Sequence, residues 1–150
     1  MPQSLAQIYL HVVFSTKNRY PFIGQEVETK FYAYIGASAK RLGGIPLSIN
    51  GTNDHIHILT LFPRTITVAD FIKDIKANSS RWMKTKGNEY QNFAWQDGYG
   101  VFSVSSSKKQ VVANYIVGQK EHHNKITFKE EFLQFLNEYQ IEYDEQYVWD

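Results

Sequence analysis

The sequence predicts an α+β protein with a ferredoxin-like (RRM-like) antiparallel sheet of four strands and two helices on one sheet face. Two further helices, the first of them bearing a tyrosine, would follow the last strand. Three observations predict this fold. The predicted elements follow the order β-α-β-β-α-β-α-α, a four-residue turn joins two neighbouring strands, and a chain of 150 residues with 43% hydrophobic content fits one domain, expected over residues 1–150.

The first strand and the first helix are predicted from their periodicity. Residues 8–14 (IYLHVVF) alternate between two faces, which is typical of a strand. Apolar residues of the segment 25–42 recur three and four positions apart, which indicates a helix. The Gly43-Gly44 pair marks its end, because glycine readily adopts the conformation that ends a helix.

The remaining elements follow from turn and cap signals. Residues 45–50 and 55–62 form a hairpin around a turn at 51–54. A capping box between Thr67 and Asp70 begins a helix that runs to about residue 86. The list of elements ends with a strand over 99–105, a helix over 108–124 capped by Ser107, and an amphipathic helix over 129–139.

Charge is distributed unevenly along the chain, although the net charge is only +1. Residues 1–129 hold all 16 lysines and arginines and 8 of the 15 acids, a balance of +8, and residues 130–150 hold a balance of −7. A basic body suits a polyanion such as nucleic acid. The acidic tail, about residues 130–150, would occupy that basic surface, dock on a partner subunit, or be a solvated end.

Several protein classes are excluded by composition. The chain has no cysteine, which excludes disulfides, cysteine-based zinc sites and cysteine nucleophiles. The N-terminal segment has no basic region, and its short apolar run contains a histidine, so it resembles neither a signal peptide nor a membrane span. A cytoplasmic location is therefore expected.

Two histidines stand one residue apart in the predicted strand over residues 55–62. Because successive side chains of a strand point to opposite faces, His55 and His57 share one face, while Ile56 and Ile58 share the other. The aliphatic pair is expected to meet the two helices, which leaves the histidines on the open face of the sheet. Such a pair suits a divalent metal ion, but it also occurs as hydrogen-bonded core residues, and two ligands do not complete a site.

A second polar pair lies on the predicted helix over 108–124. Tyr115 and Gln119 are four residues apart and therefore share one helix face. The amide oxygen of Gln119 is a hard ligand suited to Mg²⁺ or Mn²⁺, and a phenol can attack phosphorus. The pair could equally be a core tyrosine and an exposed glutamine. His122 and His123 could compete as ligands or interact with the end of the helix dipole.

Together these motifs resemble the single-tyrosine HUH transposases of small bacterial insertion sequences and their repeat-associated relatives. The resemblance rests on a histidine–hydrophobic–histidine strand (NDHIHIL), followed on a later helix by a tyrosine and a glutamine four residues apart. The stretch HVVFSTKNRYPFI is similar to the family's first strand and basic loop, and WQDGYGVFSVS to the stretch before its tyrosine helix. The similarity covers nearly the whole chain in the family's order.

The resemblance implies a metal-dependent transposase that cleaves and rejoins single-stranded DNA. Tyr115 would be the nucleophile that forms a 5′-phosphotyrosine link and leaves a free 3′-OH. His55, His57 and Gln119 would hold one Mg²⁺ or Mn²⁺. The implied partners are single-stranded DNA with hairpin ends and a second copy of the chain, because family members work as homodimers. His11, on the neighbouring strand, would either support a metal ligand or be an ordinary core histidine.

Basic residues indicate where the DNA backbone could lie, because phosphate contacts are mostly made by lysine and arginine. Three other functions stay open: a domesticated nuclease that cuts repeat hairpins without moving an element, a non-catalytic single-stranded nucleic-acid-binding protein, and a metal-dependent phosphodiesterase that uses water. The basic candidates are Lys17, Arg19, Lys73, Lys76, Arg81 and Lys84.

Overall fold

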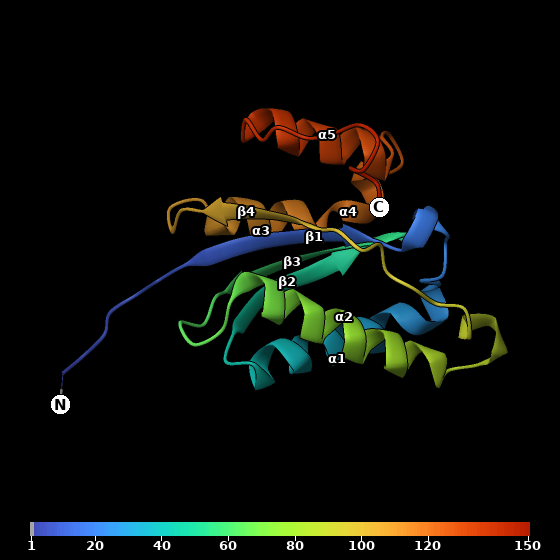
Figure 1. The fold of residues 1–150 in the computed structure, drawn as a ribbon, viewed down its shortest axis with the longest axis horizontal. Helices are drawn as coiled ribbons and strands as arrows, with labels where there is room; N and C mark the ends of the chain where they lie inside the picture. The colour runs from blue at the N-terminus through green and yellow to red at the C-terminus, as the bar shows by residue number, and fades with distance from the viewer. Residues whose placement is uncertain (1) are drawn as a thin grey trace.

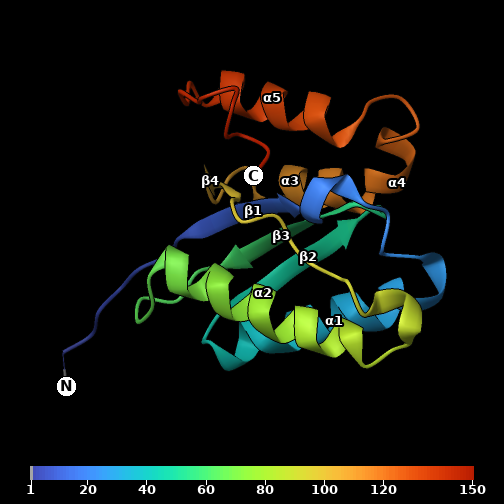
Figure 2. The ribbon, with the colours of Figure 1, turned by 45° about the vertical axis from the view of Figure 1, so that its right-hand side comes forward.

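The computed structural model describes residues 2–150 as one four-stranded antiparallel sheet with helices on both faces (Figures 1 and 2). The strand order β2-β3-β1-β4 is that of a ferredoxin-like sheet, as predicted. The elements are β1 (Tyr9–Ser15), η1 (Lys17–Arg19), α1 (Gln25–Arg41), β2 (Ile45–Gly51), β3 (His55–Leu61), α2 (Val68–Lys84), η2 (Asn88–Tyr90), β4 (Gly100–Val104), α3 (Lys109–Val117), α4 (Gln119–His122) and α5 (Phe128–Glu138).

The main core lies between the sheet and the helices α1 and α2. Ile56 and Ile58 of β3 are fully buried in it together with Phe31 of α1 and Phe71 of α2. The prediction that the aliphatic pair faces the two helices is therefore confirmed. Burial of large apolar side chains on this face supplies the main driving force for folding.

The opposite face of the sheet is covered by α3, α4 and α5, of which α5 is the uppermost element in Figure 1. Val13 of β1 and Phe102 of β4 pack there against Phe132 of α5. The expectation that His55 and His57 point to an open face is wrong, because both are fully buried beneath these helices. The amphipathic C-terminal helix has to bury its apolar stripe, and this sheet face is where it does so.

Strand register brings a third histidine to the pair. β1 and β3 are antiparallel, with Val13 opposite His57 and His11 opposite Leu59. Residues two positions apart on a strand share a face, so His11 and His57 are diagonal neighbours on the face that α5 covers.

The predicted helix over 108–124 is in fact two helices. Gly118 separates α3 from α4 with backbone angles of φ −86° and ψ 13°, and glycine is a poor residue for a helix interior. The prediction that Ser107 caps this helix is also wrong, because Lys108 occupies the cap position and no side chain bonds there. For α2, the predicted cap residue is confirmed, since Thr67 accepts a hydrogen bond from the Asp70 backbone, but the return bond from the Asp70 side chain that completes a capping box is not formed.

The acidic tail ends against the body of the protein. Trp149 packs on Phe132 of α5, and its carbonyl accepts a hydrogen bond of 2.9 Å from Arg19. The carbonyl of Asp150 accepts a backbone hydrogen bond of 2.8 Å from Gly98. The last two residues of the tail are thus held against the same chain, one of them by a basic residue, Arg19.

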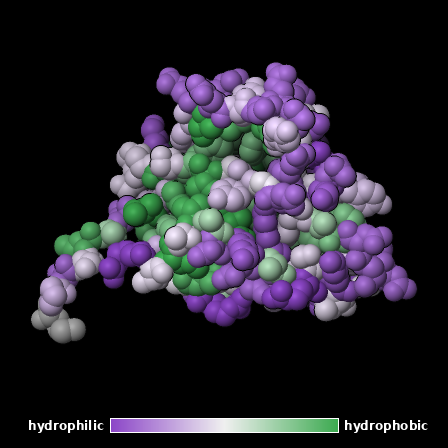
Figure 3. All heavy atoms as spheres, viewed as in Figure 1, coloured by the Kyte–Doolittle hydropathy of each residue, from purple (hydrophilic) through white to green (hydrophobic). Residues whose placement is uncertain are grey.

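Hydrophobic residues gather on the face seen in Figure 3 around β4 and the beginning of β1, while the outer side of α5 is largely hydrophilic. Ile8, just before β1, is 48% exposed. Within residues 2–150, no helix combines the length and the hydrophobicity that a bilayer crossing requires.

Candidate functional site

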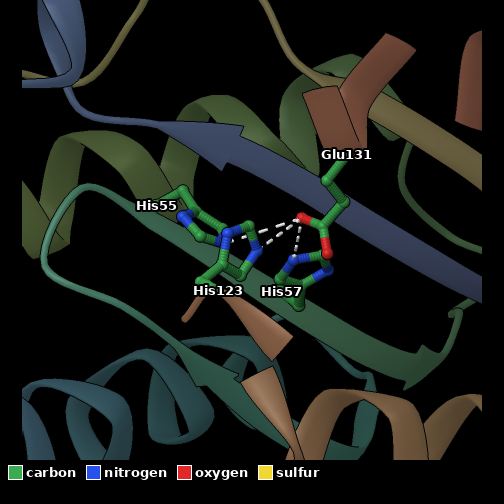
Figure 4. A group of neighbouring side chains, drawn as sticks. All are labelled: His55, His57, His123 and Glu131. Atoms are coloured by element: carbon green, nitrogen blue, oxygen red, sulfur yellow. Dashed lines mark hydrogen bonds and ion pairs between the residues drawn. The ribbon is translucent and has the colours of Figure 1, made fainter. Parts of the chain in front are cut away.

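Side chains from three parts of the chain meet between the sheet and α5. His55 and His57 come from β3, Gln119 and His123 come from α4 and its C-cap, and Glu131 comes from α5. Figure 4 shows one carboxylate oxygen of Glu131 approaching all three histidines of this group. The cluster therefore combines residues that were predicted from the sequence with Glu131, which was not.

The distances within the cluster are short. Glu131 Oε1 lies 2.9 Å from His57 Nε2, 3.1 Å from His123 Nε2 and 3.6 Å from His55 Nε2. Gln119 Oε1 lies 3.2 Å from His55 Nε2, and its amide nitrogen donates to Glu131 Oε2 at 3.1 Å. One nitrogen from each of the three histidines and one Glu131 oxygen all lie within 4.8 Å of one another. Such a group is able to hold a divalent metal ion.

Each imidazole is also held from its outer side. His55 Nδ1 lies 2.8 Å from Asp54 Oδ1, and His57 Nδ1 lies 2.7 Å from His11 Nε2. His123 Nδ1 lies 2.9 Å from the carbonyl oxygen of Ile126. Outer partners of this kind fix the tautomer and orientation of metal-binding histidines.

Burial controls the charges in the cluster. It lowers the pKa of His57 to about 4, with the Glu131 carboxylate opposing this effect, so the imidazole is neutral at neutral pH. It also lowers the pKa of His11 well below the usual value. Burial alone would raise the pKa of Glu131, but its contacts with His123, His57 and Tyr115 outweigh burial and hold that pKa far below the usual range. The cluster therefore contains a buried carboxylate beside the neutral imidazole of His57.

Tyr115 lies at the edge of the cluster and is half-buried. Its hydroxyl donates a hydrogen bond to Glu131 Oε2 and lies 3.1 Å from His122 Nε2. Burial and the Glu131 contact raise the pKa of the phenol, which is therefore protonated at neutral pH. A cavity of about 240 Å³ opens beside this hydroxyl, with Phe135 in its wall.

Local sequence places Glu131 in the cluster. Thr127 and Glu130 form a capping box that fixes where α5 begins. Glu131 then points in the same direction as the buried Phe128 and Phe132, towards the sheet. The signal that sequence reasoning missed is an acid inside the apolar stripe of an amphipathic helix, since a carboxylate is almost never buried without a partner.

The predicted DNA-contact residues are not all brought to this face. Lys17 and Arg19 lie on η1, just after the end of β1 that pairs with His55. The candidates on α2 lie on the opposite face of the sheet from Tyr115 (Figure 2). Lys76 also donates hydrogen bonds to the carbonyls of three residues in the segment 96–98. The α2 candidates are Lys73, Lys76, Arg81 and Lys84.

Gly51 and Gly36 provide a matched test of the turn that positions His55. A Cβ at Gly51 would overlap with the backbone oxygen of His55, whereas a Cβ at Gly36 of α1 would meet only Ile49 at 3.5 Å. We expect Gly51→Ala to lower the free energy of unfolding by about 1–3 kcal/mol through steric overlap. We expect Gly36→Ala to raise it by about 0.5–1 kcal/mol, because alanine favours a helix interior. Urea unfolding measures both, and equal stability of the two variants would contradict the prediction.

Comparisons with known proteins agree with the fold and with the order of the motifs. The family model described as IS200-like transposase matches residues 4–119, a segment that includes the paired histidines, Tyr115 and Gln119. The chain is thus a transposase by its family. Within that class, it belongs to the IS200-like transposases.

Two solved structures share the fold. A protein from Deinococcus radiodurans R1 that is assigned as a transposase has a TM-score of 0.62 at 22% identity, over 79% of this chain and 98% of that one. A REP-associated tyrosine transposase bound to a REP hairpin has a TM-score of 0.59 at 13% identity, over 84% of this chain and 74% of that one. No curated protein matches this sequence.

Proposed function

We propose that the protein cleaves and rejoins single-stranded DNA through a covalent link between Tyr115 and a 5′-phosphate. The observation that carries the proposal is the position of the Tyr115 hydroxyl. It contacts the same carboxylate, Glu131, that contacts the paired histidines of β3. The candidate nucleophile and the candidate metal centre thus contact the same side chain, an arrangement that suits a metal-assisted attack on phosphorus.

The residues of the cluster fit a divalent metal ion. His123 Nε2 is buried without a hydrogen-bond partner, and the neighbouring donor atoms face the same point. His55, His57 and Gln119 would hold Mg²⁺ or Mn²⁺, and His11 would keep His57 in the required tautomer. When bound, the ion polarises the scissile phosphate and stabilises the charge that develops during attack.

The chain's own residues account for the rest of the step. Tyr115 Oη forms a bond to phosphorus as the bond from phosphorus to the 3′ oxygen breaks. Glu131 Oε2 already accepts the phenol's hydrogen bond, so this carboxylate is the acceptor at hand for the proton. That proton finally resides on the departing 3′ oxygen, which leaves as a free 3′-OH. Reversal by another 3′-OH rejoins strands without ATP.

The expected substrate is single-stranded DNA with hairpin ends. Support comes from the family and from the hairpin bound to one structural relative. Lys17 and Arg19 lie at the end of the sheet nearest the cluster and are the predicted backbone contacts closest to it. Tyr115 reaches the cluster within one chain, and we propose that a homodimer holds two DNA ends together.

A denaturing gel tests the proposal directly. The purified protein is mixed with end-labelled single-stranded DNA that carries the element's own hairpin ends, with Mg²⁺, with Mn²⁺, or with chelator alone. We expect a protein-linked DNA band that requires the metal and resists denaturation. Cut DNA without a protein-linked band would indicate water as the nucleophile, and binding without cutting would leave only a DNA-binding protein.

A further inference from the structure

The tautomer of His123 is set by its backbone partner. Its Nδ1 lies 2.9 Å from the carbonyl oxygen of Ile126. A carbonyl oxygen only accepts, so Nδ1 donates to it and Nε2 is the ring nitrogen turned towards the cluster. This Nε2 is buried, has no hydrogen-bond partner, and lies 3.1 Å from Glu131 Oε1.

His55 repeats this arrangement from the opposite side of the cluster. Its Nδ1 lies 2.8 Å from the Asp54 carboxylate, which accepts the ring proton. Its Nε2 faces two oxygens that only accept, Gln119 Oε1 at 3.2 Å and Glu131 Oε1 at 3.6 Å. Imidazole nitrogens and acceptor oxygens therefore converge on one buried point, where a bound metal ion would satisfy all of them.

We infer that His123 and Glu131 are ligands of the same metal ion as the paired histidines, and that the centre prefers a transition-metal ion such as Mn²⁺ over Mg²⁺. This inference rests on the proposed function, because it concerns the same metal centre. Three imidazole nitrogens and a carboxylate oxygen, all within 4.8 Å of one another, form its ligand set.

The chemistry of the ligands gives the metal preference. Mg²⁺ binds mainly carboxylate, carbonyl and water oxygens and loses its waters reluctantly. Imidazole nitrogen suits the first-row transition metals, and their affinity for nitrogen ligands rises from Mn²⁺ towards Cu²⁺. A site with three histidines therefore discriminates against Mg²⁺ more strongly than a site with two histidines and an amide oxygen.

Glu131 then joins the metal centre to the nucleophile. Its Oε1 faces the three imidazoles, and its Oε2 accepts the hydrogen bond of Tyr115. The Glu131 carboxylate thus positions both the metal-binding imidazoles and the Tyr115 hydroxyl. Its location on α5 makes this helix part of the centre, although the family match ends at residue 119.

Metal titration of the full chain without DNA tests the inference. Isothermal titration measures the affinity for Mn²⁺ and for Mg²⁺, and the visible absorption of bound Co²⁺ reports the ligands. His123→Asn keeps a donor for the Ile126 carbonyl but removes Nε2, and Glu131→Gln keeps the shape of the side chain. We expect each change to weaken Mn²⁺ binding by at least about 10-fold. That is the smallest loss of affinity typical of removing an outer partner of a metal ligand, and a ligand itself should matter more. We also expect each to change the Co²⁺ spectrum.

The control is Asn124→Ala, because Asn124 is adjacent to His123 in sequence but is exposed to solvent. We expect it to leave the Mn²⁺ affinity unchanged. Unchanged affinity in His123→Asn and Glu131→Gln, with binding lost in His55→Ala, would overturn the inference but leave the proposed function standing. Tighter binding in Glu131→Gln would also overturn it, since Glu131 would then compete with the ion. Circular dichroism of each variant checks folding.

Discussion

Tyr115→Phe is expected to abolish the protein-linked DNA band and to slow strand cleavage by about 10³-fold or more, because removal of a nucleophile eliminates the covalent step. The ring packing is kept, and Glu131 Oε2 retains its hydrogen bond from Gln119. The fold and the metal centre should therefore survive. A single-turnover assay with labelled DNA measures the rate, and binding of Mn²⁺ by the variant checks that the centre is intact.

Tyr139→Phe is the matched control for this experiment. Tyr139 is the C-cap residue of α5, and its hydroxyl donates to the carbonyl of Ser103 at 3.3 Å. We expect its removal to leave the adduct unchanged. An adduct that persists in Tyr115→Phe would show that another residue is the nucleophile, and the proposed mechanism would then be wrong.

Phe31→Ala is expected to cause the largest loss of stability. Phe31 is fully buried, and its ring stacks on Trp82 at 5.6 Å and on Trp95 at 5.7 Å. Truncating a core phenylalanine removes its transfer free energy and leaves a cavity, so we expect a loss of about 3–5 kcal/mol. The melting temperature of a chain of this size should fall by about 10 °C.

Thermal and urea unfolding measure this effect. Tyr147→Ala removes an aromatic ring that is 60% exposed, and it should change the stability by less than about 0.5 kcal/mol. A Phe31→Ala protein as stable as this control would mean that the helices α1 and α2 do not depend on the aromatic stack.

Sequence periodicity predicted the sheet and its first helix layer well, for a physical reason. Alternation in residues 8–14 and 55–62 separates two faces, and each face needs a partner. Ile56 and Ile58 pack in the core with residues of α1 and α2, as expected. These are local patterns, and a short turn between neighbouring strands leaves few possible topologies.

The covering of the histidine face was not predictable in the same way. The periodicity of residues 129–139 shows that the helix has an apolar side, but it does not say which surface that side covers. Glu131 joins His57 across 74 positions of sequence, and no local pattern encodes such a contact. The break at Gly118, which puts Gln119 at the start of a new helix, does have a local signal, because glycine is a poor residue for a helix interior.

The long separation between β3 and α5 also has a consequence for when the candidate site is assembled. A chain emerging from the ribosome folds from its N-terminal side, so the histidines of β3 are in place before Glu131 has been synthesised. Nascent chains therefore lack the carboxylate that joins the cluster to Tyr115. Under the proposed mechanism, strand cleavage is therefore expected only from molecules in which α5 has docked.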